Sequence, residues 1–553
     1  MSFGNNIVFL LRFALVAIIF GVCWGVSFAQ TSSDVAPQTF ARIDETHESK
    51  STQSVTDSDR VLVTNESADT SKTKEKNYSE KRNAEIVFDE YQQRLEDLAK
   101  KCDELSMPLE AKVTRSLIYP DNTEIFTIPL LPVQETPRKL PADANKNQRF
   151  WFSALNRLRG QYSDEIYSFA EYFGDKKRGY DVVACVLTTL FVNPDHTKAR
   201  HFFNYTLQDG VWRSRWELQQ LEKGLVETPE FGWLPAENVD RYRNGERFYK
   251  RQWISSQEEE KRILASASGW RVDTEHFSIL SRVSLERGVE IGRLLEAYYQ
   301  AWSRLFFRMI ASETQWSSQL YLNTEIVTKR HKIIIYRNRE EYLRELKKHD
   351  SNVSLSVGGY FPNLRCTFVY EPSKDDNFDL LPLLFHETTH QLFEECSTSS
   401  QGRFKVDFQS RAKVSNFWVV EGVAVYAETF KVNASKSAAT LGGGRNVFRI
   451  QCALESLFVD KDYVSLREYA GLSREEFQNR RDIATLYSEA AGLAYFFMHY
   501  DNGVYRDAFV TYLYNVYQGI DSRDSLEKVT GKTFEELDRE YIDFMQSLYH
   551  ASK

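Results

Sequence analysis

His386, Glu387 and His390 are the residues whose types and spacing point most directly to chemistry. On a helix, side chains four residues apart lie one above the other, so both imidazoles can bind one tetrahedral metal ion. The glutamate beside the first histidine then leans toward the open position of that metal. This HExxH spacing is typical of zinc-dependent hydrolases. The alternative is two histidines that merely share a helix face, but their neighbours are apolar and unpaired core histidines are costly.

The segment from Asp379 to Phe393 is predicted to be the helix that carries these residues. Asp379 can accept hydrogen bonds from the first free N–H groups, and Pro382 suits the first helical turn. Apolar side chains supply faces for burial, namely Leu380, Leu383, Leu384, Leu392 and Phe393. We therefore predict a buried helix with one metal-binding face.

A third metal ligand is predicted downstream, because a tetrahedral site with one open position needs three protein ligands. Glu421 interrupts the apolar helical run from Trp418 to Glu428 on its buried side. A carboxylate in such surroundings needs a cation. We therefore predict that Glu421 completes the site begun by His386 and His390.

The same segment resembles the gluzincin metallopeptidases, whose third zinc ligand is the glutamate of a WLNEGFAxYxE-like motif. The matching positions are Trp418, Glu421, Gly422, Ala424, Tyr426 and Glu428. The resemblance implies one Zn²⁺ per chain, bound by His386, His390 and Glu421. It also implies a zinc-activated water, from which Glu387 takes the proton as general base. Glu428, one heptad after Glu421 and on nearly the same helix face, is predicted to orient a ligating histidine.

Two features depart from the gluzincin pattern. Val420 stands where many relatives have Asn, and the interval from Gln391 to Val420 is longer than in the best-known members, which indicates an insertion beside the site. The segment from Leu486 to Ala491 looks like the YxKGA-type segment of aminopeptidase-like gluzincins. That resemblance implies that Tyr487 donates a hydrogen bond to the tetrahedral intermediate. The alternative is a chance match, because the chain contains 29 tyrosines.

The predicted fold class is α+β and mostly helical. The resemblance covers roughly residues 269–548 and implies a gluzincin-like catalytic domain, assigned to 266–553, with a small mixed sheet and a helical lobe. Alternating apolar residues predict strands at Trp270–Leu280, Lys332–Tyr336 and Arg365–Tyr370. The order of these elements also resembles an uncharacterised exported family that is abundant in planctomycete bacteria.

A peptide or protein is the predicted substrate. An edge strand beside the metal can align an extended peptide by main-chain pairing. The GAMEN-like segment with which aminopeptidases grip a free amino terminus has no counterpart here, so endopeptidase action is favoured. The alternative function is a catalytically silent binding or scaffold protein that keeps the metallopeptidase fold and acts through an N-terminal helical domain.

The N-terminus is predicted to be a signal peptide, residues 1–29. Arg12 precedes an apolar run from Phe13 to Val26, and Ser27-Phe28-Ala29 forms a small-x-small cleavage site. An uncleaved segment would instead anchor the chain in a membrane. Residues 30–84 are rich in polar residues and are predicted to be a disordered linker. The protein is therefore expected to be exported, whether to the periplasm, the cell surface or the medium.

Residues 85–265 are predicted to form a helical, tetratricopeptide-like domain. An apolar stripe at helical spacing opens it, comprising Phe88, Tyr91, Leu95, Leu98, Cys102 and Leu105. The NPDHxxAR segment from Asn193 to Arg200 resembles the closing half of a tetratricopeptide repeat, but one unit is fewer than an array needs. The segments Gly232–Pro235 and Asn238–Arg262 are predicted to be a linker and a solvated helix.

The composition of this 553-residue chain excludes one class of binding partner. A net charge of −8 without a cluster of basic and aromatic residues argues against nucleic acid as a partner. Five cysteines remain once the signal peptide is removed, so at most two disulfide bonds can form within the chain. The sequence does not indicate an oligomeric state.

Overall fold

The computed structural model describes residues 84–118, 125–131, 140, 142–266, 268–322, 329–349, 356–399, 415–433, 438–443 and 447–550. The predicted signal peptide, 1–29, lies outside these residues, as does the predicted linker, 30–84, apart from Ala84. None of the described helices has the length and apolar character that crossing a membrane requires.

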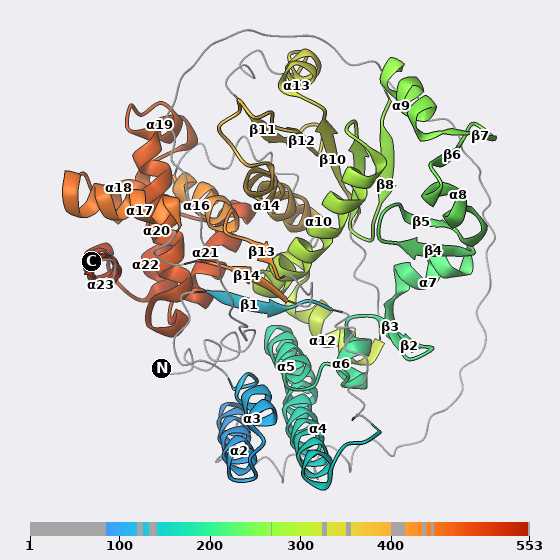
Figure 1. Cartoon of the computed structure of the whole chain (residues 1–553). Coiled ribbons are helices and arrows are strands. Elements are labelled where there is room, and N and C mark those ends of the chain that lie inside the picture. The colour runs from blue at the N-terminus through green and yellow to red at the C-terminus, as the bar shows by residue number, and fades with distance from the viewer. Residues whose placement is uncertain are drawn as a thin grey trace, which may run out of the picture.

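The fold is α+β and mostly helical, as predicted, and its largest sheet has five strands in the order β11-β12-β10-β9-β8 (Figure 1). β9 and β12 pair with β10 in parallel, whereas the edge strands β8 and β11 are antiparallel to their neighbours. The strands are β8 (Trp270–Asp273), β9 (Phe277–Ser281), β10 (His331–Tyr336), β11 (Gly358–Phe361) and β12 (Cys366–Tyr370).

The single strand predicted at Trp270–Leu280 is wrong, because the segment is a hairpin of β8 and β9. Thr274 makes the turn, and its backbone N–H donates to the carbonyl of Phe277 at 2.9 Å. Apolar alternation continues through both strands and therefore hides the turn between them.

One face of this sheet is buried in the main core, whereas the other face is only partly covered, with Arg271 and Lys332 exposed. Ile333 and Ile335 of β10 belong to the main core, together with helices α10 (Leu285–Leu305) and α14 (Leu380–Ser399). Tyr336 faces the opposite side, where it packs with Tyr342 of α13 (Arg339–Leu346) and Phe368 of β12. Successive strand residues alternate between the faces, so one strand serves two cores.

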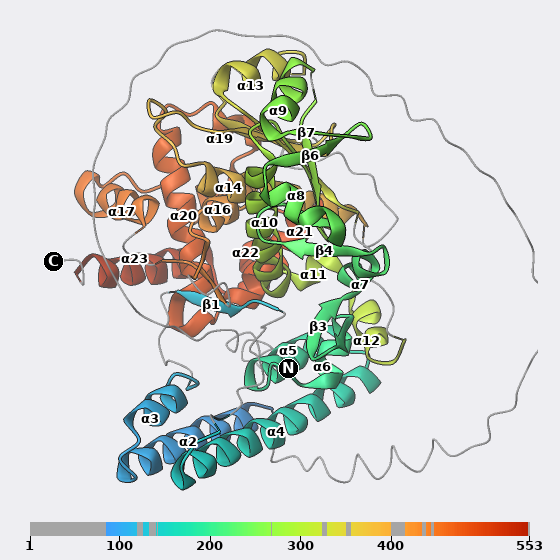
Figure 2. The same cartoon turned by 45° about the vertical axis from the view of Figure 1, so that its right-hand side comes forward.

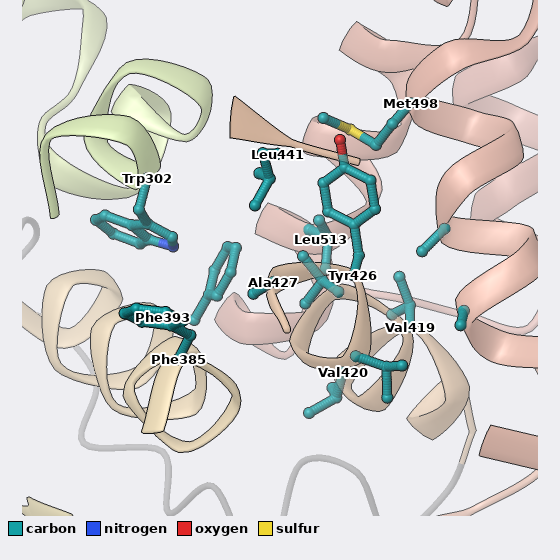
Figure 3. Packing of buried hydrophobic residues seen from close by; sticks show 14 of the residues in the cluster. Trp302, Phe385, Phe393, Val419, Val420, Tyr426, Ala427, Leu441, Met498 and Leu513 are labelled. Atoms are coloured by element: carbon teal, nitrogen blue, oxygen red, sulfur yellow. The ribbon is translucent and has the colours of Figure 1, made fainter. Parts of the chain in front are cut away.

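A helical lobe packs against α14 on the side away from the sheet (Figure 1). Figure 3 shows Phe385 and Phe393 of α14 close to Trp302 of α10, with Tyr426 and Met498 of the lobe continuing the same core. The lobe contains α16 (Phe417–Ala427), α17 (Phe448–Glu455), a π-helical turn (Ser456–Asp460), α18 (Leu466–Gly471), α19 (Arg474–Gln478), α20 (Ile483–His499), a 3₁₀ turn (Tyr500–Gly503), α21 (Arg506–Gln518), α22 (Ser525–Thr530) and α23 (Phe534–His550).

The N-terminal part begins with helices that pack side by side, of which α2 and α4 are the longest (Figure 2). They are α2 (Ala84–Glu104), α3 (Pro108–Arg115), α4 (Lys146–Asp175), α5 (Gly179–Val192) and α6 (Thr197–Phe202). Phe307, Ala311 and Trp316, from the region of α11 (Phe307–Ile310) and α12 (Glu313–Leu322), complete their core. β1 (Phe126–Pro129) instead joins β14 (Ala438–Leu441) and β13 (Lys431–Val432) in a three-stranded sheet.

Residues 205–265 differ from the helical structure and linker predicted there. Three β-hairpins, each followed by a short helix, occupy this stretch. Trp212, Trp233 and Trp253 recur on the second strand of each hairpin. The elements are β2 (Tyr205–Gln208), β3 (Val211–Ser214), α7 (Arg215–Glu222), β4 (Leu225–Thr228), β5 (Gly232–Pro235), η2 (Ala236–Asn238), α8 (Val239–Arg243), β6 (Glu246–Tyr249), β7 (Gln252–Ser255) and α9 (Ser256–Ala265). Four-residue strands in a highly charged segment give little alternation to detect.

The described part of the chain shows no disulfide. Cys102, Cys185, Cys366 and Cys396 are buried thiols, and Cys452 is half-buried. Buried thiols of this kind act as small apolar core residues.

Glu489 makes the stability of the helical lobe depend on pH. Its side chain is 2% exposed on α20, and burial raises the pKa of the carboxyl from 4.5 to about 8, although the backbone N–H of Val464 opposes this. The folded state therefore keeps a proton that the unfolded state releases above about pH 4.5, so stability falls as pH rises from there toward 8.

At pH 7 we expect the free energy of unfolding of Glu489→Gln to exceed that of the wild type by about 2–3 kcal/mol, because the amide has no proton to lose. The variant should therefore unfold at a higher urea concentration. Urea titrations at about pH 4 and pH 7 measure this difference. The two proteins should agree at pH 4. A variant that is equally destabilised at both pH values would contradict the buried, protonated state of Glu489.

Candidate metal centre

The helix that carries the HExxH motif is α14, as the sequence predicts. It begins at Leu380, and the Asp379 side chain accepts a hydrogen bond from the Leu381 backbone N–H at 3.2 Å. Its apolar residues are buried in the main core. The Thr389 hydroxyl donates to the carbonyl of Phe385 at 2.6 Å and accepts from the Tyr298 hydroxyl of α10 at 2.5 Å. These contacts hold the helix at a fixed rotation, so the histidine face cannot turn away.

Helix α16 carries Glu421, and a strained residue fixes where this helix starts. Asn416 has a positive φ of 61°, a conformation that asparagine tolerates better than most residues. Its side-chain amide donates to Asp521 at 2.6 Å, and its oxygen accepts from the Tyr512 hydroxyl at 2.6 Å. The buried asparagine thus ties the first turn of α16 to α21 and the segment after it.

A close approach of two helices places Tyr487 next to Glu421. A Cβ at Gly422 would lie 2.7 Å from the carbonyl oxygen of Ala490, so α16 and α20 can come this close only with glycine there. The Tyr487 side chain lies beside Glu421 and close to Glu387. Burial and the nearby carboxylates raise the pKa of Tyr487, so the phenol keeps its proton and remains a hydrogen-bond donor.

The three predicted metal ligands converge on one point. Nε2 of His386 lies 3.2 Å from Nε2 of His390, and Oε2 of Glu421 lies 3.5 Å and 3.7 Å from these two nitrogens. A tetrahedral zinc ion with bonds of about 2.0–2.1 Å requires ligand atoms about 3.4 Å apart. The described residues contain no other group of three or more His, Cys, Asp or Glu side chains arranged in this way. The donor set therefore fits zinc in both chemistry and spacing.

The charges around this point favour a cation. Burial opposes charge on His386, but hydrogen bonds to Glu421 and Glu428 outweigh it and raise the pKa of the imidazole to about 10. Burial also opposes charge on Glu421, yet His390 and His386 hold the pKa of that carboxyl far below its usual range. Glu421 and Glu428 therefore stabilise positive charge at this point. A dication that replaces the imidazole proton would be stabilised by the same carboxylates.

Glu428 occupies the orienting position predicted for it. Its Oε1 lies 2.9 Å from Nδ1 of His386, which directs Nε2 of the same ring toward Glu421. Nδ1 of His390, by contrast, is buried with no hydrogen-bond partner among the described residues. A carboxylate on the outer nitrogen of a ligating histidine fixes its tautomer and strengthens it as a ligand.

Replacing Glu428 by Ala is expected to weaken zinc binding about 10- to 100-fold, because His386 loses the acceptor that orients it. Competition with a chromophoric chelator measures the affinity. Glu428→Gln is the matched control, since its amide oxygen can still accept the hydrogen bond and the loss should be smaller. Wild-type affinity in Glu428→Ala would exclude this orienting role.

Glu387 lies against the edge strand of the sheet. Its Oε2 accepts a hydrogen bond from the backbone N–H of Tyr360 in β11 at 2.8 Å. The Tyr360 hydroxyl in turn donates to Glu395, five residues after His390 on the same helix, at 3.4 Å. Glu395 is buried and also bonded to His331 of β10 at 2.9 Å. This network connects the metal-binding helix to two strands, and sequence reasoning missed it.

Comparison of the sequence with protein-family models and with curated proteins finds no match. The candidate centre is therefore defined by its own geometry, in which His386, Glu387, His390, Glu421, Glu428 and Tyr487 lie together.

Proposed function

We propose that this protein is an exported zinc-dependent metallohydrolase of the gluzincin type, a peptidase that cleaves within peptide chains. The observation that carries the proposal is the spacing of the three ligand atoms of His386, His390 and Glu421, which matches the edges of a zinc tetrahedron. Glu387, beside this point, is the side chain that a hydrolase needs as its base.

Zinc bound there would act as a Lewis acid that polarises a carbonyl and lowers the pKa of water from about 15.7 toward 7. Glu387 takes the proton of the attacking water and returns it to the departing amine nitrogen. The Tyr360 N–H holds Oε2 of Glu387 during this transfer. The Tyr487 hydroxyl donates to the oxyanion, a contribution of about 2–4 kcal/mol to the barrier.

The position of Glu387 at the strand edge supports a peptide substrate. β11 is an edge strand among the described residues and pairs antiparallel with β12 only. In such a strand, the N–H and C=O groups of alternate residues point away from the partner. The Tyr360 N–H points outward, since it bonds Glu387, so the Tyr360 carbonyl also faces outward. The Gly358 carbonyl, on the same side, accepts a hydrogen bond from the Ser356 hydroxyl. An extended peptide paired along this edge would pass directly beside the base.

Metal analysis and peptide cleavage together test the proposed function. The secreted portion, from Gln30 onward, should contain about one zinc per chain by mass spectrometry. It should also cleave internal bonds in a mixed peptide library. A chelator should abolish cleavage, and added zinc should restore it. A zinc-loaded protein that cleaves no member of the library would favour the silent binding or scaffold protein instead.

A further inference from the structure

A cavity of about 250 Å³ lies apart from the candidate metal centre. Its lining comes from helices α5, α6, α7, α10 and α12 and from the hairpin of β2 and β3. The residues of the candidate metal centre do not line it. Ligand pockets in proteins usually measure about 300–1,000 Å³. This cavity lies just below that range, so it suits only a small molecule.

Aromatic side chains form one wall of the cavity. Phe202 and Trp316 stack with their ring centroids 5.9 Å apart and their planes 21° from parallel. Tyr299 and Phe307 extend the wall, and all four residues are buried. A wall of this kind binds the apolar body of a ligand and leaves its orientation to polar groups elsewhere.

Arg304 supplies a cation that the described residues leave incompletely bonded. Its guanidinium has five N–H donors, and Nη2 makes one long contact, 3.5 Å from Oε1 of Gln300. That oxygen already accepts the backbone N–H of Leu131 at 2.6 Å, so it is a shared acceptor. Burial lowers the pKa of Arg304 to about 10, and the nearby guanidinium of Arg200 also lowers it. An anion placed here would accept hydrogen bonds from the remaining N–H groups of Arg304.

The other charged side chains of the lining restrict where an anion can sit. Arg215 is exposed and marks the side open to solvent. His276 is already engaged with Glu296, with Nδ1 2.7 Å from the carboxylate. Glu275 also lines the cavity and repels a second negative group. A ligand with one anionic end and an uncharged remainder therefore fits best.

We propose that this cavity binds a small monocarboxylic acid, with its carboxylate on Arg304 and its apolar body against the aromatic wall. A planar guanidinium matches a carboxylate in a bidentate arrangement, which adds direction as well as strength. This site is independent of the proposed peptidase activity, and its occupancy is measured without any turnover.

Isothermal titration of the full chain with 3-phenylpropionate and with its neutral amide tests the proposal. We expect the acid to bind at least about tenfold more tightly than the amide. Arg304→Gln should remove this preference, whereas Arg271→Gln, at an exposed arginine outside the cavity, should retain it. Equal binding of acid and amide, no binding of either, or a preserved preference in Arg304→Gln would overturn the proposal.

Two further measurements separate a ligand site from a structural arginine. Arg304→Gln removes a poorly bonded cation, so its melting temperature should match or exceed that of the wild type. Ser303→Leu leaves Arg304 in place but fills the cavity, and it should abolish binding of the acid. A large fall in melting temperature for Arg304→Gln would show that Arg304 serves the fold and not a ligand. Wild-type binding by Ser303→Leu would show that the acid binds outside this cavity, and either result would overturn the proposal.

Discussion

Replacing Glu421 by Ala is expected to release zinc from the protein, because two imidazoles alone leave a tetrahedral site with half of its ligands. Glu421→Gln should show the same loss, since the amide keeps the shape of the side chain but not its charge. We expect the zinc content, measured by mass spectrometry after dialysis, to fall from about one per chain to nearly none. Peptide cleavage should disappear with the metal.

Glu455→Gln is the matched control, because it makes the same change at an exposed glutamate of α17 in the same lobe. It should keep its zinc. Glu421 is buried beside two histidines, so far-UV circular dichroism of each variant must first show that the fold survives the substitution. A Glu421 variant that holds one zinc as tightly as the wild type would mean that the third ligand is another residue.

The candidate ligands are the part of the site that the sequence predicts, because their signals are local. A spacing of four residues places His386 and His390 on one helix face whatever the helix packs against. Glu421 stands out as a carboxylate in an apolar run, and Glu428 follows it at a helical repeat. The position of each ligand along its own helix was therefore predictable before any tertiary contact was known.

The contacts between elements were not predictable, because no local pattern encodes them. The hydrogen bond from Tyr360 to Glu387 uses a backbone N–H, which every residue but proline has, and depends on how β11 is placed against α14. Glu395 did carry a signal, as a second carboxylate in the buried part of the same helix. Its partner His331 lies on a distant strand, so the signal indicates a need for a partner but not which one.

The hairpins of residues 205–255 include one turn that the sequence indicates and one turn that it does not. Asp209 and Gly210, both with positive φ, form a turn, and an Asp-Gly pair is a strong sequence signal for such a hairpin. Lys250 and Arg251 adopt positive φ without glycine, in a turn that sequence rules do not anticipate. Contacts of Trp253 stabilise this last hairpin instead: its ring packs against Phe248, and the guanidinium of Arg241 lies over the Trp253 ring.

Replacing Glu387 by Gln is expected to lower peptide cleavage about 10²- to 10⁴-fold while zinc stays bound. The amide cannot accept the proton of the attacking water, but it is not a metal ligand, and its oxygen can still accept the Tyr360 N–H. Initial rates and zinc content measured on the same preparation separate the two effects. Glu455→Gln should retain both properties. If Glu387→Gln cleaves as fast as the wild type, Glu387 is not the base. If the variant loses its zinc, the Glu387 carboxylate is needed for metal binding together with His386, His390 and Glu421.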